Sequence, residues 1–228
     1  MGMDLGYILI CVAALAIAIV VHESAHALAA YLLGDSTARE RGRISFNPLA
    51  HIDPFGTIVL PLIMLLAGGP VFAFAKPVPV YLGNLKHPKR DEVLVSLAGP
   101  ASNVVLAVLA ACLLRAIGDL PIDVYNALNY DLVVVVTEFC ITAISSNLSL
   151  AFFNLIPLPP LDGSSIIVPF LKGEALRTYY RIQQYAMPIL IVVLYLLPSV
   201  LHIDLIGMYF DVTVYPLYRM LLGFALGL

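Results

Sequence analysis

The feature that most constrains this chain is a run of seventeen uncharged, mostly apolar residues from Leu5 to Val21. It continues without a break into His22-Glu23-Ser24-Ala25-His26, and no glycine or proline follows between Tyr7 and Gly34. A helix needs about 20 mainly apolar residues to cross a bilayer, and glycine commonly follows a helix end. The sequence therefore predicts a membrane-spanning helix over residues 5–33. Its second half carries three ionisable side chains, which at membrane depth are costly and usually functional.

The two histidines in this helix have the spacing of metal ligands. Residues four apart lie on one helical face, so His22 and His26 can offer two imidazoles to one metal ion. A His-Glu-x-x-His pattern indicates zinc, with Glu23 placed as the general base for the bound water. The alternative is a polar helix end that matches the pattern by chance.

The composition places the whole chain in a membrane. Hydrophobic residues make up 61% of it and charged residues 12%, against about 45–50% and about 25% in soluble domains. The length of 228 residues suits a single membrane-embedded domain over residues 1–228. A net charge of −3 without a basic run gives no indication of a nucleic-acid partner.

Five segments are long and apolar enough to span the bilayer: 5–33, 91–117, 132–156, 185–201 and 206–227. The basic residues between them fall into three clusters. By the positive-inside rule these clusters are cytoplasmic, which puts the N-terminus outside. The clusters are Arg39, Arg41 and Arg43; Lys86, Lys89 and Arg90; and Lys172, Arg177 and Arg181.

A sixth apolar stretch, residues 55–75, is interrupted by prolines and glycines and has basic clusters on both sides. It must therefore enter and leave on the same side, as a re-entrant hairpin buried against protein. The return limb, residues 71–80, contains Pro77 and Pro79. It is either a short β-edge, where prolines are tolerated, or the exit of a helical hairpin. The expected fold class is thus an all-α polytopic membrane protein with about five transmembrane helices plus this hairpin.

A third zinc ligand is expected at Asp162, which follows the proline-rich end of the third span and precedes Gly163. The first and third spans both run toward the cytoplasm, so Asp162 reaches the same half of the membrane as His22 and His26. A zinc site with three protein ligands and one open position is typical of catalysis. The alternative is that Asp162 caps the helix that starts near Ser164.

These motifs together resemble the site-2 protease family of intramembrane zinc metalloproteases. The resemblance rests on the first-span motif, on Ala98-Gly99-Pro100-Ala101-Ser102-Asn103, and on Asn154-x-x-Pro157-x-Pro159-x-Leu161-Asp162-Gly163. It covers a catalytic core of about residues 1–170, with accessory helices over about 185–228. Residues 46–54 and 76–79 resemble a compact bacterial and archaeal branch, so neither a PDZ nor a CBS domain is expected.

The resemblance implies hydrolysis of a peptide bond in or beside the transmembrane segment of a membrane-protein substrate, as in regulated intramembrane proteolysis. It implies one Zn²⁺ on His22, His26 and Asp162, with Glu23 as the catalytic base. Asn154 would hold the oxyanion or the substrate backbone. The enzyme would work in the cell membrane, with its site in the cytoplasmic half. Asn103 is a weaker candidate for the role of Asn154, and hydrogen bonding between helices is the favoured reading for it.

Two other functions fit parts of this pattern. A catalytically inactive zinc-binding receptor or chaperone could use the same core, although pure binding needs no general base such as Glu23. A transporter would usually show two repeated halves with paired broken helices. Only one broken apolar segment, residues 55–75, is apparent in the sequence.

Overall fold

The computed structural model describes residues 5–59, 63, 74–193, 198, 200 and 202–228. Four helices are long: α1 (Leu5–Leu33), α4 (Pro88–Gly118), α6 (Tyr130–Asn154) and α10 (Leu205–Leu226). Throughout the described ranges the regular structure is helical and no strand is formed, which confirms the all-α class. The shorter elements are α2 (Thr37–Glu40), α5 (Ile122–Ala127), α7 (Gly173–Gln183), α8 (Ala186–Ile191), η1 (Pro48–Ala50), η2 (Pro54–Val59), η3 (Leu82–Asn84) and η4 (Asp162–Phe170).

Three described helices, α1, α4 and α6, are long and apolar enough to cross a membrane. They correspond to the first three predicted spans. The predicted span 206–227 forms α10 but is not among these three. The predicted span 185–201 begins as α8, and residues 194–197, 199 and 201 lie outside the described residues. The count of five spans therefore stays a prediction.

The predicted hairpin falls mostly on residues that the structure does not describe, namely 60–62 and 64–73. Its first residues form the π-helical η2. At its far end, residues 74–80 have no regular secondary structure, so this part of the expected β-edge does not appear as a strand. The choice between a re-entrant and a plain helical hairpin stays open.

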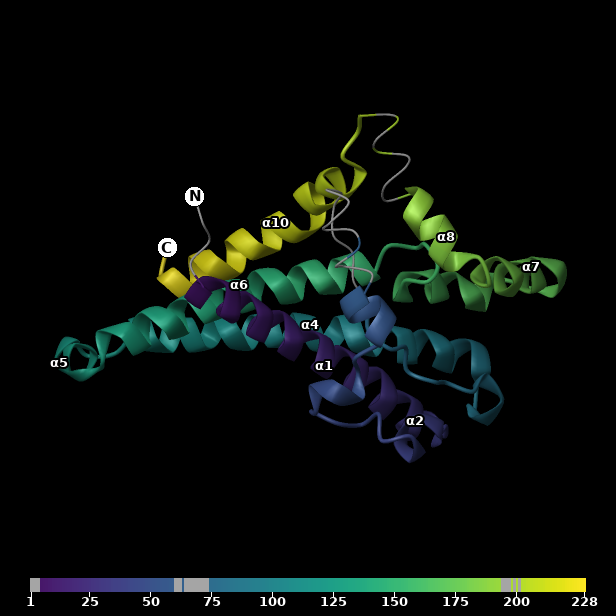
Figure 1. Cartoon of the computed structure of the whole chain (residues 1–228), viewed down its shortest axis with the longest axis horizontal. Coiled ribbons are helices and arrows are strands. Elements are labelled where there is room, and N and C mark those ends of the chain that lie inside the picture. Colours follow the sequence, from purple (N-terminus) through teal and green to yellow (C-terminus); the bar gives the residue numbers. More distant parts are fainter. Residues whose placement is uncertain (1–4, 60–62, 64–73, 194–197, 199, 201) are drawn as a thin grey trace.

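The long helices form a bundle in which α1, α4 and α6 pack against one another (Figure 1). The fourth long helix, α10, packs against α4 and α6. Together these three helices form a buried apolar cluster. Many large apolar side chains elsewhere on the helices are exposed, as expected for surfaces that face lipid. The cluster contains Ala107, Ala111, Leu114, Cys140, Ile144, Leu148, Val214 and Ala225.

The buried face of α1 explains why its histidines point into the bundle. Residues four apart follow one another along a helical face, and small side chains let neighbouring helices approach closely. On α1 this face is a four-residue repeat of alanines that includes both histidines. Its members are Ala14, Ala18, His22, His26 and Ala30, all buried.

The facing surface of α4 has the same four-residue repeat. Gly99 and Asn103 lie at the level of the α1 histidines, and alanines continue the row beyond them. Two rows of small residues with this spacing let the two helices approach closely where they cross. The row on α4 is Val95, Gly99, Asn103, Ala107 and Ala111.

Candidate metal centre

The three predicted ligands meet at one point inside the bundle. The Nε2 atoms of His22 and His26 lie 3.1 Å and 3.3 Å from Oδ2 of Asp162. All three ligand atoms lie within 4.8 Å of one another, with both histidines buried and Asp162 half-buried. The fold thus brings together His22 and Asp162, which are 140 residues apart in the sequence. Two imidazole nitrogens and one carboxylate oxygen form a donor set that suits zinc with one open position.

Asp162 reaches the histidines because the chain folds back at the end of α6. Gly163 allows this turn, since a Cβ there would lie 2.2 Å from the carbonyl oxygen of Leu155. A glycine is therefore needed at this position because two backbone segments approach each other closely. Asp162 is the first residue of η4, and the side chain of the capping residue, Leu161, makes no cap bond. The carboxylate of Asp162 faces the imidazoles, so the geometry favours metal binding over a helix-cap role.

The second ring nitrogen of each histidine has a fixed partner. Nδ1 of His26 donates to the backbone carbonyl of Val95 at 2.7 Å, and Nδ1 of His22 donates to Oδ1 of Asn103 at 2.6 Å. A carbonyl oxygen only accepts, so the proton sits on Nδ1 and the Nε2 lone pair is left for a metal. The two imidazoles are therefore oriented as metal ligands.

The orientation of Asn103 is itself set by two further bonds. Its Nδ2 group donates to the carbonyl of Ala18 at 3.0 Å and to Oδ1 of Asn147 at 2.8 Å. Both amide hydrogens are used, so Oδ1 is the atom left to accept from His22. Asn103 thus joins α1, α4 and α6. This agrees with the helix-to-helix role favoured for it, and it adds the contact with His22, which the sequence argument did not anticipate.

Gly99 forms the floor of the centre. A Cβ at this position would lie 2.4 Å from Nε2 of His26 and 2.6 Å from Nε2 of His22, so any side chain here would force the imidazoles to shift. The glycine of the Ala98–Asn103 motif therefore makes room for the imidazole edges that carry the ligand atoms. The sequence marked this motif only by resemblance, because a contact between two helices has no signal within either one.

Glu23 is half-buried beside the ligands and lies within electrostatic range of Arg43. Burial lowers the pKa of Arg43, and the negative charge of Glu23 partly offsets this. The Arg43 guanidinium donates to the carbonyl of Ala50 at 2.7 Å and to that of Lys76. The sequence analysis counted Arg43 only as a topology signal. In the fold it is buried and anchors the end of the predicted hairpin near the centre.

Asn154, predicted to contact the substrate, makes its side-chain hydrogen bond within its own helix. It is the last residue of α6, half-buried, and its Nδ2 donates to the carbonyl of Leu150 in the same helix at 3.0 Å. Its role toward a substrate stays a prediction.

Comparison with known proteins adds independent support. The profile of Peptidase family M50 matches residues 10–197. "Putative zinc metalloprotease YwhC" of Bacillus subtilis (strain 168) is 42% identical over 153 residues, which cover 67% of this chain and 65% of that protein. "Putative zinc metalloprotease Rip2" of Mycolicibacterium smegmatis is 31% identical over 189 residues, covering 83% of this chain and 68% of that protein.

The protein of the same name from Mycobacterium tuberculosis (strain H37Rv) is 30% identical over 194 residues, covering 85% of this chain and 69% of that protein. The matches thus span about two thirds of the length of these curated relatives. No solved structure gives a significant match. The profile match covers most of the chain, including the helix that carries His22 and His26 and the turn that carries Asp162. The chain therefore belongs to peptidase family M50, the site-2 protease family that its motifs resemble.

Proposed function

We propose that this protein is a zinc-dependent endopeptidase that hydrolyses a peptide bond in or beside the transmembrane segment of a membrane protein. The observation that carries the proposal is the convergence of His22, His26 and Asp162 inside a bundle of three span-length helices. A ligand set held at that depth suits a substrate that is itself in the bilayer. The names of the relatives, which refer to zinc metalloproteases, support the same class of reaction.

His22, His26 and Asp162 would hold one zinc ion. When bound, the ion supplies a Lewis acid that makes water nucleophilic at neutral pH and polarises the scissile carbonyl. Glu23, one residue from His22, would accept a proton from the attacking water and deliver it to the leaving amine. Asn154 would steady the oxyanion or the substrate backbone after moving from its bond with Leu150.

The positive-inside rule supports a cytoplasmic position for this centre in a cell membrane. Arg39 and Arg41 follow the end of α1 nearest the histidines, and Lys89 and Arg90 lie in the first turn of α4. Both groups therefore gather beyond the same end of the bundle, which the rule assigns to the cytoplasm. Regulated intramembrane proteolysis is the physiological process that fits a peptidase with this placement.

An inactive receptor or chaperone on the same core would also bind zinc and membrane segments. The retained carboxylate of Glu23 favours the peptidase, since a site that only binds has no use for a general base.

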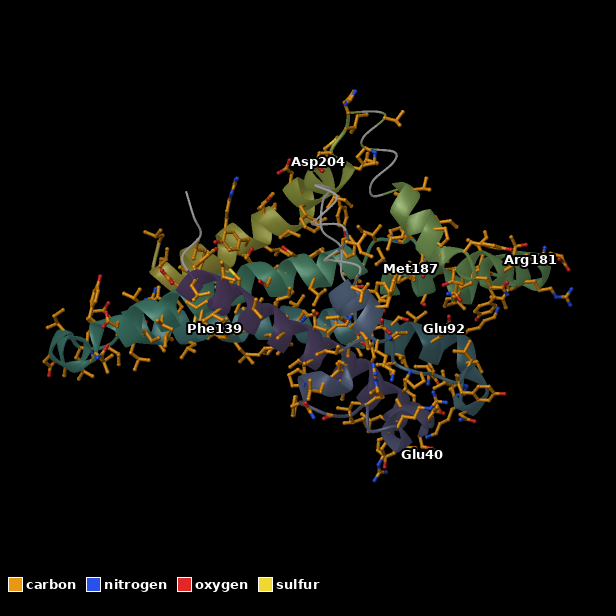
Figure 2. The ribbon with its side chains drawn as sticks, viewed as in Figure 1. Glu40, Glu92, Phe139, Arg181, Met187 and Asp204 are labelled. Atoms are coloured by element: carbon orange, nitrogen blue, oxygen red, sulfur yellow. The ribbon has the colours of Figure 1, made fainter. Side chains whose placement is uncertain are left out.

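The decisive experiment expresses wild-type protein, Glu23→Gln and the control Glu40→Gln, in which the changed carboxylate is exposed on α2 (Figure 2). Membrane proteins that accumulate uncut are then identified. We expect wild type and Glu40→Gln to cleave, and Glu23→Gln to keep its zinc while cleavage falls by a factor of 10² or more. Cleavage by Glu23→Gln at the wild-type rate would falsify the mechanism. Retention of zinc and substrate binding, with no cleavage by wild type either, would favour the receptor.

A further inference from the structure

A cavity of about 480 Å³ is lined by residues close in the chain to the metal ligands and by Glu92, which follows Lys89 and Arg90. Its wall includes Val95, whose carbonyl holds His26, and Pro160 and Ser165, which flank Asp162 in the chain. The opposite wall comes from residues 77–82, which follow the predicted hairpin, and from α7 and α8. A substrate chain leaving the centre in this direction would therefore pass into the cavity.

One carboxylate lines the cavity. Glu92, in the second turn of α4, is among its lining residues and is only 9% exposed (Figure 2). Its Oε2 atom accepts a hydrogen bond from the hydroxyl of Tyr180 on α7 at 2.8 Å. Within the described part of the chain this is its one hydrogen bond, and no cation pairs with it. A carboxylate offers about four acceptor positions, so most of its capacity is unused.

The basic residues next to Glu92 in the sequence are committed elsewhere. Nζ of Lys89 donates to the carbonyl of Leu171, and the guanidinium of Arg90 pairs with Asp91 at 2.8 Å. A sheltered carboxylate without a cation is electrostatically costly, and an incoming ammonium or guanidinium group would offset that cost. The cavity thus has negative charge and room, and the nearby chain does not neutralise it.

Resting on the proposed function, we propose that this cavity is the subsite for the cytoplasmic flank of the substrate and that Glu92 selects a Lys or Arg there. Membrane proteins carry their excess of Lys and Arg on the cytoplasmic side of a span. The basic residues of this chain gather at the same end of the bundle. The basic flank of a substrate would therefore lie at the same membrane depth as these residues. A Lys or Arg is therefore common in the substrate flank that would enter the cavity, and Glu92 is its complement.

Tyr180 positions this carboxylate. Its neighbour Tyr179 bonds with Ser164, two residues from Asp162, at 3.2 Å, so α7 contacts both the ligand turn and the cavity wall. If Glu92 served only to fasten α7 to α4, removing either partner of the Glu92–Tyr180 bond would have the same effect. If Glu92 binds a substrate cation, the preference for that cation depends on the charge of Glu92 and little on the Tyr180 hydroxyl.

The test measures peptide binding in a non-ionic detergent. The probes are two labelled peptides of about 20 apolar residues, flanked at one end by three lysines or by three glutamines. For wild type and Tyr180→Phe we expect the lysine peptide to bind about tenfold more tightly. For Glu92→Gln, and for Ser96→Lys, which adds an ammonium group to the cavity, we expect the ratio of the two dissociation constants to fall to about one.

A wild-type ratio near one overturns the inference, and so does a high ratio that survives in both Glu92→Gln and Ser96→Lys. Equal loss of preference in Tyr180→Phe and Glu92→Gln assigns the pair a fastening role and also overturns it. The same peptides, incubated with wild type and Glu23→Gln, test the proposed function separately. Glu92-dependent preference without Glu23-dependent cleavage refutes the peptidase alone, whereas cleavage without preference refutes the subsite alone.

Discussion

At the scale of single residues, the centre depends on side chains whose role lies across a helix interface. The spacing of His22 and His26 could be read from the sequence because both lie on one helix. Asp162 could be placed because two spans run in the same direction. The contacts of Gly99 and Asn103 with these histidines could not be read, because they depend on how α4 is rotated against α1. The meeting of the three predicted ligands could thus be anticipated, whereas the residues that orient the histidines were known only as parts of a motif.

Gly99→Ala should impair metal binding without unfolding the bundle. The added methyl group would lie 2.4 Å from Nε2 of His26, so the imidazoles must move away from the point where Asp162 meets them. We expect zinc affinity to fall at least tenfold, as measured by metal titration of the purified protein. Gly118→Ala is the matched control, because a Cβ at the end of the same helix meets nothing within 4 Å. Wild-type affinity in Gly99→Ala would show that the histidines do not bind metal in this arrangement.

Asn103→Leu should weaken zinc binding by a different route. It removes the acceptor for Nδ1 of His22 while keeping the number and branching of the heavy side-chain atoms, so the imidazole loses its fixed tautomer and angle. Loss of such a supporting bond usually costs 10–100-fold in metal affinity. Ser102→Ala is the control, because the hydrogen bond that the Ser102 hydroxyl makes among the described residues goes to the carbonyl of Gly99 in its own helix. Equal affinities in the two variants would refute an orienting role for Asn103.

At the scale of elements, the first three spans were predicted to within three residues at each end, because apolar length is a strong signal. The differences have local causes. α4 begins at Pro88 instead of 91, since proline suits the first helical turn and the Asp91 carboxylate accepts from the amide of His87. α6 begins at Tyr130 because the side chain of Asn129 caps it. It ends at Asn154, three residues before Pro157.

The connections between elements were harder to predict, and the end of α1 shows why. Asp35 is fully buried and accepts hydrogen bonds from Thr37, from the amide of Tyr81 at 2.6 Å and from the side chain of Asn84 at 2.9 Å. These bonds fasten the end of α1 to the segment that leads into η3. No spacing rule links residues 35 and 81, so the sequence offers no sign of this contact.

Asp35 should make stability depend on pH in the acid range. Burial alone would raise its pKa, but the bonds from Thr37, Asn84 and Tyr81 outweigh burial and hold the pKa of Asp35 below its usual value. A carboxylate with a depressed folded pKa contributes stability above its unfolded pKa of about 3.9, and that contribution is lost as the pH falls through the folded value. Thermal unfolding from pH 7 to pH 2 should show this loss in wild type.

At pH 7, Asp35→Asn should have a lower melting temperature than wild type, because the charged acceptor is gone. Its free energy of unfolding should be lower by about 2–4 kcal/mol. The difference from wild type should narrow below about pH 4. Asp123→Asn in α5 is the control, since its carboxylate has no hydrogen bond or ion pair in the part of the chain that the structure describes. A gap between wild type and Asp35→Asn that stays constant over the whole pH range would contradict the pKa assignment.

At the scale of the whole molecule, the proposed centre would act as a cross-link. His22 and His26 belong to the first helix, and Asp162 follows the third span-length helix, so a shared ion would join two parts that the chain connects only through α4 and α6. The rows of small residues let these helices meet closely, and the ligands lie where the rows cross. Stability and metal binding should therefore be coupled across the bundle.

Removing the metal should lower the melting temperature of wild-type protein. Binding to the native state alone stabilises it by RT ln(1 + [Zn²⁺]/Kd), about 4 kcal/mol when free zinc is 1,000 times the dissociation constant. Chelation should remove that amount, and added zinc should restore it. His22→Ala should have the same melting temperature with chelator and with added zinc, because one ligand and the bond to Asn103 are lost together. His87→Ala, an exposed histidine before α4, should respond like wild type. If wild type and His22→Ala responded equally to chelation, zinc would have to bind elsewhere, and the link between α1 and the Asp162 turn would rest on protein contacts alone.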